Sequence, residues 1–431
     1  MNTIALSYGR GHLDIALPPD ARPTVIRKQQ LPKLTDGKAA VIAALHNPVA
    51  SKPLADLAKN RKSACILICD ITRPVPNGLF LRPMIEMMIS SGIPQEKISV
   101  LVATGLHRPN LGDELAELVG DPRVLANVRV ENHYARDEAA HVDFGFTRTR
   151  HTPVKLDRLF AEADLRIATG LVEPHFMAGW SGGRKVIAPG VAHHETIRTF
   201  HSARFMEDPL AVQCNLIGNP LHEEQLEIVR MLGEVYALNT VLDENRDLVC
   251  VTFGEIIASH QAAIDFVSSA TQIPLSRKFS TVVTSSAGYP LDKTYYQTIK
   301  GMVTPLDILE TRWHADHCLG MLGRFRFTGI PRGTGAAGRT RPRAFPGDPD
   351  GKEPRRDRRM ANGDAVKADA AWQRRTLYDG PCRRRPQADR RRHDRQPATC
   401  HCSEHHGKRR PGCRRHPGGA VCRTAIRRIS D

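Results

Sequence analysis

Four short apolar runs, each ending at a polar loop, constrain the fold of this chain more than any other feature. They cover residues 63–70, 97–105, 164–170 and 280–286. The first two are followed by helical patterns, at residues 79–90 and 113–119. Short apolar runs that alternate with helices are typical of a parallel, doubly wound sheet. The pattern therefore predicts an α/β fold with Rossmann-like parallel sheets.

The sequence also predicts two domains. A helix and a linker at residues 252–277 mark a boundary, so we place an N-terminal α/β domain at residues 1–270 and the start of a second at 275–311. A further helix is expected across residues 209–241, whereas residues 1–60 show only weak strand patterns between Pro and Gly turns. Because open α/β sheets bind ligands at the carboxyl ends of their strands, we expect a cleft between the domains.

Polar side chains follow each predicted strand at this edge. They are Asp70 with Arg73, then His107, then His175, and finally Tyr296, Gln297 and Lys300 on the helix after the fourth strand. Asp70 and Arg73 have two interpretations. They form either a local ion pair of small energetic value or, in a crowded cleft, a site where the guanidinium binds a phosphate or carboxylate.

Residues 171–185 combine a histidine, a glycine-rich turn and a lysine. Gly182 and Gly183 allow the backbone a close approach and positive φ. Lys185 follows them and can meet a phosphate or form a covalent bond. A phosphate loop of the Walker A type needs Ser or Thr after its lysine, and Val186 stands there instead. An NTPase is therefore not expected, and a plain turn with a surface lysine is the simpler alternative.

Three histidines lie beside glycines or strand ends, at His107, His175 and His201. Taken singly, a loop histidine is usually a surface residue. As a group, they can exchange acid and base roles on two sides of a substrate, or bind a metal ion. The adjacent His193 and His194 are interpreted as a solvated pair instead of a metal site.

Charge divides the chain in two. Residues 1–312 hold 33 Lys and Arg against 34 Asp and Glu, whereas residues 313–431 hold 29 against 12. The first part therefore has the composition of a near-neutral enzyme. No run approaches the eighteen apolar residues of a membrane helix, and the N-terminus shows no secretory signal, so a cytoplasmic protein is expected.

The motifs together resemble one family. They are Asp70-Ile71-Thr72-Arg73-Pro74, Thr104-Gly105-Leu106-His107-Arg108-Pro109, Glu173-Pro174-His175 through Gly182-Gly183-Arg184-Lys185, Thr199-Phe200-His201 and Tyr295-Tyr296-Gln297-Thr298-Ile299-Lys300-Gly301. Five motifs in this order resemble the nickel-pincer lactate racemases, which act on 2-hydroxy acids. The resemblance covers most of residues 1 to 310 and implies an isomerase.

The resemblance also implies a cofactor and site residues. The family carries nickel in a pyridinium-3,5-bisthiocarboxylic acid mononucleotide, made by separate cofactor-synthesis proteins and joined to a lysine. By position, that lysine is similar to Lys185, the nickel ligand to His201, and the acid/base pair to His107 and His175. The remaining positions line the cofactor (Asp70, Arg73, Gly182, Gly183, Tyr296) and the substrate (Arg73, Gln297, Lys300).

The implied chemistry suits these residues. Removing the α-proton of a 2-hydroxy acid is difficult because its carboxylate already repels carbanion charge, whereas transfer of a hydride to the cofactor and back avoids that charge. Each histidine then serves as base in one direction and as acid in the other. Arg73 or Lys300 would hold the substrate carboxylate in position.

The family pattern stops at residue 312. The resemblance implies a glycine pair and then an apolar strand after Leu309-Glu310, but the sequence there continues as Trp313-His314-Ala315-Asp316-His317-Cys318. Reading the codons one base forward permits Gly-Thr-Leu-Ile-Ile-Ala. We therefore interpret residues 312–431, rich in Arg, Pro and Gly, as out of frame and disordered. The strand at residues 281–285 is then left with an unpaired edge, and activity is impaired.

The alternative is a genuine basic tail that binds nucleic acid. Within it, residues 400–406 contain Cys and His but no clean pair of Cys-x-x-Cys spacings for zinc.

Overall fold

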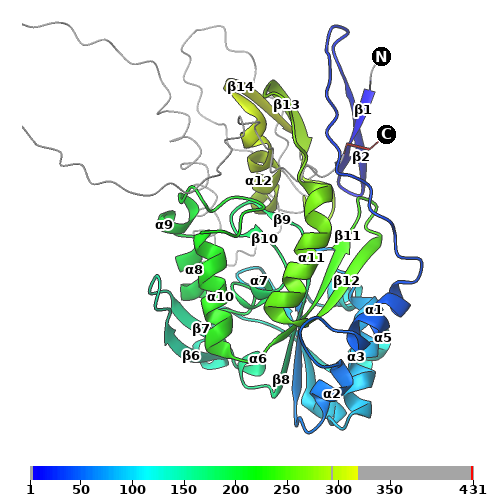
Figure 1. Cartoon of the computed structure of the whole chain (residues 1–431), viewed down its shortest axis with the longest axis vertical. Coiled ribbons are helices and arrows are strands. Elements are labelled where there is room, and N and C mark those ends of the chain that lie inside the picture. Colours follow the sequence, from blue (N-terminus) through cyan, green and yellow to red (C-terminus); the bar gives the residue numbers. More distant parts are fainter. Residues whose placement is uncertain (1–2, 293–294, 319–428, 431) are drawn as a thin grey trace, which may run out of the picture. The chain divides into compact units, whose positions relative to one another are not determined.

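The computed structural model of this chain describes residues 3–292, 295–318 and 429–430, with the backbone alone for 295, 296, 311–318, 429 and 430. Its central element is a six-stranded sheet of order β12-β11-β8-β3-β4-β5 (Figure 1). The strands are β3 (Ala64–Cys69), β4 (Ile98–Ala103), β5 (Arg129–Asn132), β8 (Leu165–Leu171), β11 (Tyr236–Leu242) and β12 (Leu248–Glu255). All neighbours are parallel except β11 and β12, so the predicted α/β class with a parallel sheet is confirmed.

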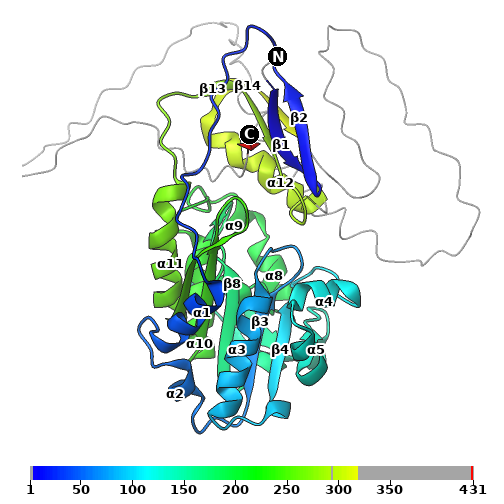
Figure 2. The same ribbon diagram turned by 90° about the vertical axis from the view of Figure 1, so that its right-hand side faces the viewer.

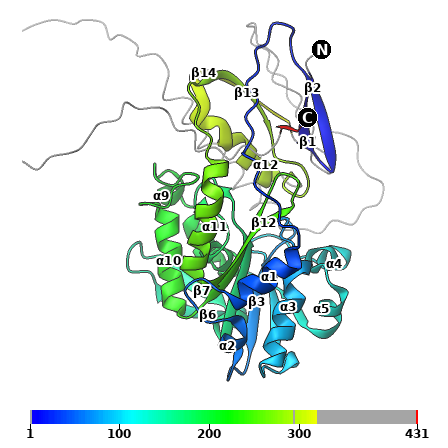
Figure 3. The ribbon, with the colours of Figure 1, turned by 45° about the vertical axis from the view of Figure 1, so that its right-hand side comes forward.

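Helices cover both faces of this sheet, as Figures 2 and 3 show for α1, α2 and α3 on one face and α10 on the other. One face packs against α1 (Gly37–His46), α2 (Leu54–Ala58), α3 (Asn77–Ser90), α4 (Asp113–Val119) and α5 (Pro122–Asn127). The other packs against α6 (Arg158–Ala161), α7 (Arg184–Ile187), α8 (His194–Phe200), α9 (Ala203–Met206) and α10 (Pro220–Leu232). Successive strand residues point to opposite faces, so Ile66 and Ile68 pack on the first face and Cys65 and Leu67 on the second.

Smaller elements complete the large sheet. α11 (Ile256–Thr271) contacts β11 and β12 and packs Ile264 near Trp180. Two antiparallel pairs, β6 (His141–Phe146) with β7 (Pro153–Asp157) and β9 (Pro174–His175) with β10 (Gly179–Trp180), flank the connections to α8 and α7. The short helices η1 (Gln95–Lys97) and η2 (Glu138–Ala140) precede β4 and β6. Among the described residues, no helix combines the length and the apolar composition that crossing a membrane requires.

A second, smaller sheet begins after α11. β13 (Phe279–Ser285) is followed by α12 (Tyr295–Val303), η3 (Thr304–Ile308) and β14 (Leu309–Cys318), and β13 pairs with β14 in parallel. The hairpin of β1 (Thr3–Tyr8) and β2 (Gly11–Ala16) also contacts this region, because the Gly9 amide donates to Asp292 Oδ2 at 2.7 Å. β15 (Ile429–Ser430) pairs with β1.

The pairing of β13 with β14 corrects one expectation from the sequence. We expected the segment from residue 312 to be disordered and to leave residues 281–285 with an unpaired edge. The disorder was wrong for residues 314–318, because Thr281 to Ser285 pair with His314 to Cys318. Ladder hydrogen bonds join main-chain groups, so a strand can form here without the apolar side chains expected of a buried one. The rest of the segment interpreted as out of frame, residues 319–428, lies outside the described residues. The domain division near residue 270, and the cleft, stay predictions.

Two local expectations were also wrong. The helix expected at residues 209–241 is confined to α10, because Asn219 caps its start and Gly233, at φ 89°, ends it before the buried strand β11. Residues 1–60, where the sequence showed only weak strand patterns, contain the helices α1 and α2. The signal for α1 was present in the sequence, since the Asp36 side chain accepts from the Ala39 amide as an N-cap.

Candidate active site

Three loops at the carboxyl ends of neighbouring strands carry the predicted acid/base residues. Asp70 follows β3, His107 lies in the loop after β4, and His175 lies in β9 just beyond β8. These strands are adjacent in the order β8-β3-β4. The parallel topology therefore brings residues over a hundred positions apart to one edge of the sheet, as the strand pattern predicted.

Asp70 and His107 form a hydrogen-bonded pair. His107 Nδ1 lies 2.5 Å from Asp70 Oδ2, while Thr72 Oγ1 donates to Asp70 Oδ1 at 2.6 Å. Burial raises the pKa of the Asp70 carboxyl, but the hydrogen bond and charge of His107, together with Arg73 and Thr72, outweigh it, so this pKa is lowered. An ionised carboxylate can only accept, so His107 Nδ1 donates, and any proton exchange with a substrate takes place at Nε2. This arrangement orients a histidine as a base.

His175 has the opposite tautomer. Its buried ring accepts at Nδ1 from the backbone amides of Met177 and Ala178, at 3.4 and 3.2 Å. Burial, followed by the charges of Lys185 and Lys300, holds the pKa of His175 well below its ordinary value. The ring is therefore neutral at physiological pH and carries its proton at Nε2. It is arranged to donate, whereas His107 is arranged to accept.

Cationic side chains gather beside these histidines. Burial, and next the charge of Arg73, lower the pKa of the half-buried Lys185 to about 7. Burial, Arg73 and Lys185 likewise hold the pKa of Lys300 well below its ordinary value. Each positive charge in this group lowers the pKa of its neighbours. Positive charge in this group therefore exceeds the negative charge that would compensate it. Such a site favours an anionic ligand.

The helix α12 adds two of the predicted substrate residues to this group. Lys300 Nζ donates to Gln297 Oε1 at 2.5 Å, and Gln297 Nε2 lies 3.4 Å from His107 Nε2. A chain of contacts thus runs from Asp70 through His107 and Gln297 to Lys300. Tyr296 belongs to α12, but its side chain lies outside the described residues.

The glycines next to Lys185 approach the protein itself. Gly182 (φ 77°) would place a Cβ 2.9 Å from Val172 Cγ2, and Gly183 (φ 48°) would place one 2.7 Å from the His260 ring. Both are therefore required for packing of this loop, which leaves their predicted cofactor contacts a prediction.

Residues that the sequence interpretation missed hold the same loop. His260 Nε2 donates to Ser181 O at 2.7 Å, and Asn239 Oδ1 accepts from the Gly183 amide at 3.1 Å. The fully buried Arg184 donates to Ala178 O at 3.0 Å. Asn239 and His260 come from β11 and α11, and no local pattern connects them to residue 183.

His201 is the C-cap of α8, and its Nδ1 lies 2.8 Å from Ile197 O. A carbonyl oxygen only accepts, so Nδ1 carries the proton and Nε2 the lone pair. Metal-binding histidines usually have this backbone contact. The expectation for His193 was wrong: its ring is fully buried, not solvated, because it packs among the rings of His141 and His194.

Comparisons with known proteins agree with this arrangement. Residues 8–213 match the family model of the lactate racemase N-terminal domain. A lactate racemase of Thermoanaerobacterium thermosaccharolyticum is 32% identical over 304 residues, which are 70% of each chain. This chain belongs to the lactate racemase family.

Two further similarities support this membership. A lactate racemase of Lactiplantibacillus plantarum is 34% identical over 258 residues, so the match spans 60% of each of the two chains. The structure of the lactate racemase apoprotein from T. thermosaccharolyticum aligns with a TM-score of 0.66 and 30% identity over 72% of each chain. The resemblance found in the five motifs is thereby confirmed at the level of the family.

Proposed function

We propose that this family member is an isomerase that racemises lactate or a related 2-hydroxy acid. The observation that carries the proposal is the placement of two histidines at one edge of the sheet with opposite hydrogen bonds at Nδ1: His107 donates to Asp70, and His175 accepts from backbone amides. Inverting a carbinol centre by hydride transfer needs one group that takes the hydroxyl proton and another that returns a proton to the keto oxygen. Family membership supports the same activity.

The cations define the substrate class. A 2-hydroxy acid has a carboxylate beside its hydroxyl, and Arg73 and Lys300 supply positive charge beside His107 and His175. Lys300 already bonds to Gln297, whose amide reaches His107. A carboxylate bound by Arg73 and Lys300 would place its hydroxyl beside the two histidines, where orientation contributes several kcal/mol.

The residues also fit the cofactor that the family implies. Lys185, with a pKa of about 7, is about half neutral at pH 7, and the neutral amine is the nucleophilic form needed for an amide-type bond. His201 has its lone pair at Nε2, the form that a nickel ion requires. The charges of Arg73 and Asp70 both act on the Lys185 amine: Arg73 lowers its pKa and Asp70 raises it. When bound, the nickel-pincer nucleotide would supply the hydride acceptor.

The proton steps belong to the protein. His107 Nε2 takes the hydroxyl proton of one enantiomer, and the imidazolium that forms is stabilised by Asp70. Returning a proton to the planar keto acid from the other side requires His175 as its imidazolium, which gives up the Nε2 proton and is left as the neutral ring. In the reverse direction the two roles exchange, so each ring must change its protonation state once per turnover.

Chiral chromatography of L- and D-lactate after co-expression with cofactor-synthesis proteins tests this function. His107→Ala and His175→Ala should each abolish interconversion, whereas His201→Ala should also lose nickel. The exposed His12 is a matched control, and His12→Ala should leave the rate unchanged. Peptide mass spectrometry should find the cofactor mass on Lys185. Full activity in His107→Ala, or an unmodified Lys185 in active nickel-loaded protein, would contradict the assignment.

We further propose that residues from 312 onward are translated in a shifted frame and that this impairs the activity. The support is the change in charge at residue 313 and the apolar strand encoded one base forward. The coding DNA near Thr311 tests it directly, and a frame-repaired chain should racemise faster than the present one. Salt-dependent DNA binding by the full chain would instead support a genuine basic tail.

A further inference from the structure

A second group of titratable side chains lies apart from the candidate active site. His133, His141, His193 and His194 form a row in which successive ring centroids are 5.2, 5.0 and 4.2 Å apart. Glu138, on η2, reaches this row from the connection between β5 and β6. Neither the proposed racemisation nor the cofactor uses any of these residues.

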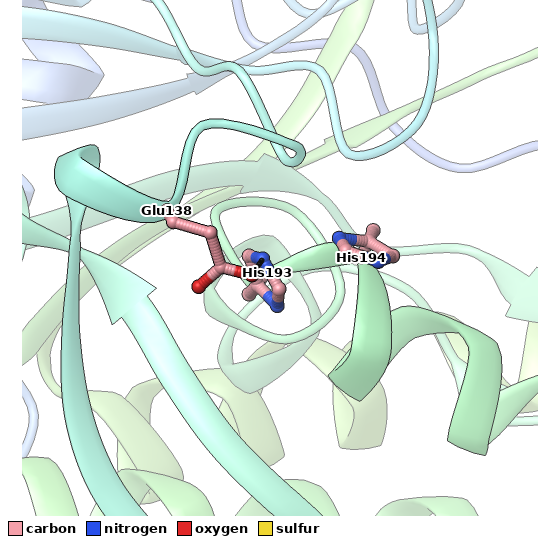
Figure 4. A group of neighbouring side chains, drawn as sticks. All are labelled: Glu138, His193 and His194. Carbon is pink, nitrogen blue, oxygen red and sulfur yellow. Dashed lines mark ion pairs between the residues drawn. The ribbon is translucent and has the colours of Figure 1, made fainter.

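Three of these side chains converge on one point. One ligand atom from each of Glu138, His193 and His194 lies within 4.8 Å of the other two, and Figure 4 shows the Glu138 carboxylate directed at the His193 ring. Glu138 Oε1 is 3.0 Å from His193 Nε2. Within the part of the chain that the structure describes, this buried nitrogen nevertheless lacks a partner in hydrogen-bond geometry, and so does His194 Nδ1. Buried ring nitrogens are normally satisfied, so this position needs a ligand.

We propose that Glu138, His193 and His194 bind a divalent transition-metal ion, zinc by preference. Two imidazoles and one carboxylate are the protein ligands of many four-coordinate zinc sites, with a water in the fourth position. Imidazole nitrogen favours zinc, nickel and copper over magnesium and calcium, which prefer all-oxygen sites. A set of three side chains at this spacing needs only side-chain adjustment to reach bond lengths of about 2 Å.

The surroundings supply the outer contacts that such a site requires. The Glu195 amide donates to His193 Nδ1 at 3.4 Å, and Glu195 Oε2 lies 3.6 Å from the same nitrogen. When Nε2 binds the metal, its proton moves to Nδ1, so the amide contact breaks and the Glu195 carboxylate becomes the acceptor. Lys155 Nζ lies 3.3 Å from Glu138 Oε2 and 3.3 Å from Glu195 Oε2. Because Lys155 contacts Oε2 of Glu138, the other carboxylate oxygen, Oε1, is the one directed toward His193. Binding therefore moves one proton from Nε2 to Nδ1 within His193, with no net release from that ring.

The backbone fixes both histidines before any ion arrives. The amide of His193 donates to Lys155 O at 2.9 Å, and the amide of His194 donates to Ala135 O at 2.8 Å. The site is thus held by β7 on one side and by the residues after β5 on the other.

The ion would fasten the start of α8. His193 is the N-cap of this helix and His194 its first residue, while His201 caps its other end about 10 Å away. A metal at the N-terminal end would tie α8 to η2, and so stabilise the helix that positions His201. Without a metal, the same residues form an ion-pair network of Glu138, Lys155, Glu195 and His193. That network is the competing explanation.

Zinc binding by the purified full chain, without cofactor or substrate, distinguishes the two. After chelator treatment and dialysis, titration calorimetry with zinc chloride should show one site, and cobalt should give the visible spectrum of four-coordinate Co²⁺. Glu138→Gln and His194→Ala should each weaken zinc binding at least tenfold, because each removes one of three protein ligands. Glu162→Gln, an equally exposed glutamate paired with Arg158, is the matched control and should bind as the parent does.

Thermal unfolding separates binding from misfolding. Zinc should raise the melting temperature of the parent and of Glu162→Gln, but not of Glu138→Gln, whose metal-free melting temperature should match the parent because Glu138 is mostly exposed. Failure of the parent to bind zinc, or equal affinity in Glu138→Gln and His194→Ala, would overturn the proposal. The second result would place the ion elsewhere, such as at residues 400–406. Neither result bears on racemisation, because no substrate takes part.

Discussion

Replacing Lys185 by Met should stabilise the protein, and by more at pH 6 than at pH 9. Burial lowers the pKa of Lys185 to about 7, against 10.5 for an ordinary lysine. Below pH 7 the amine is protonated in both the folded and the unfolded chain, so the folded state bears the whole cost of burying a charge. Above pH 7 the folded amine is neutral while the unfolded amine still binds a proton, so stability rises with pH.

The lowered pKa of Lys185 sets how much the unfolding free energy changes with pH. One pKa unit corresponds to about 1.4 kcal/mol, so the cost of burying the Lys185 charge falls by at most about 3 kcal/mol between pH 7 and pH 9. Lys185 is only half-buried, and screening by water reduces this to about 1–2 kcal/mol. Methionine has a similar length and no charge, so it removes the cost at every pH.

Chemical denaturation followed by circular dichroism at pH 6 and pH 9 measures the effect. The gain in unfolding free energy of Lys185→Met over the parent should be larger at pH 6 by about 1–2 kcal/mol. The exposed Lys97 provides the control, and Lys97→Met should show no such difference. An equal gain from Lys185→Met at both pH values, or a larger one at pH 9, would refute the argument that burial controls this amine.

Three further predictions concern other parts of the chain. Asp70→Asn in the frame-repaired chain should lower the racemisation rate by about 10²–10⁴, since His107 loses its charged acceptor, and a loss below fivefold in a chiral assay would contradict this. Gly183→Ala should cost about 1–3 kcal/mol in thermal unfolding, because its Cβ meets the His260 ring at positive φ. His260→Ala should recover part of that cost, and additive costs would argue against the contact. Limited proteolysis of the present chain should leave a stable fragment ending near residue 270 and digest the chain after about 311, whereas a resistant segment at 319–428 would speak for a genuine tail.

The sequence predicted best where structure depends on local pattern. The apolar runs became β3, β4, β8 and β13, and the polar residues after the first three meet at one sheet edge because parallel topology requires it. Contacts between distant segments could not be predicted. Nothing near residue 183 indicates that His260 packs against it, or that His175 accepts two backbone amides. The burial of His193 likewise depends on rings from another part of the chain, so adjacency to His194 suggested a solvated pair instead.

The reactivity of Lys185, compared with that of other lysines, depends on the packing of the loop that contains Gly183. Gly183 and the His260 ring are 77 positions apart, so Lys185 reaches its desolvated place only when α11 has docked on the large sheet. In a nascent or unfolded chain, Lys185 is one protonated amine among many. In the folded chain it is about half neutral at pH 7. An acylating enzyme or reagent reacts with neutral amines, so it should modify Lys185 in preference to ordinary lysines, and only in the folded chain. Acylation of Lys185 would therefore report that the core around it has formed.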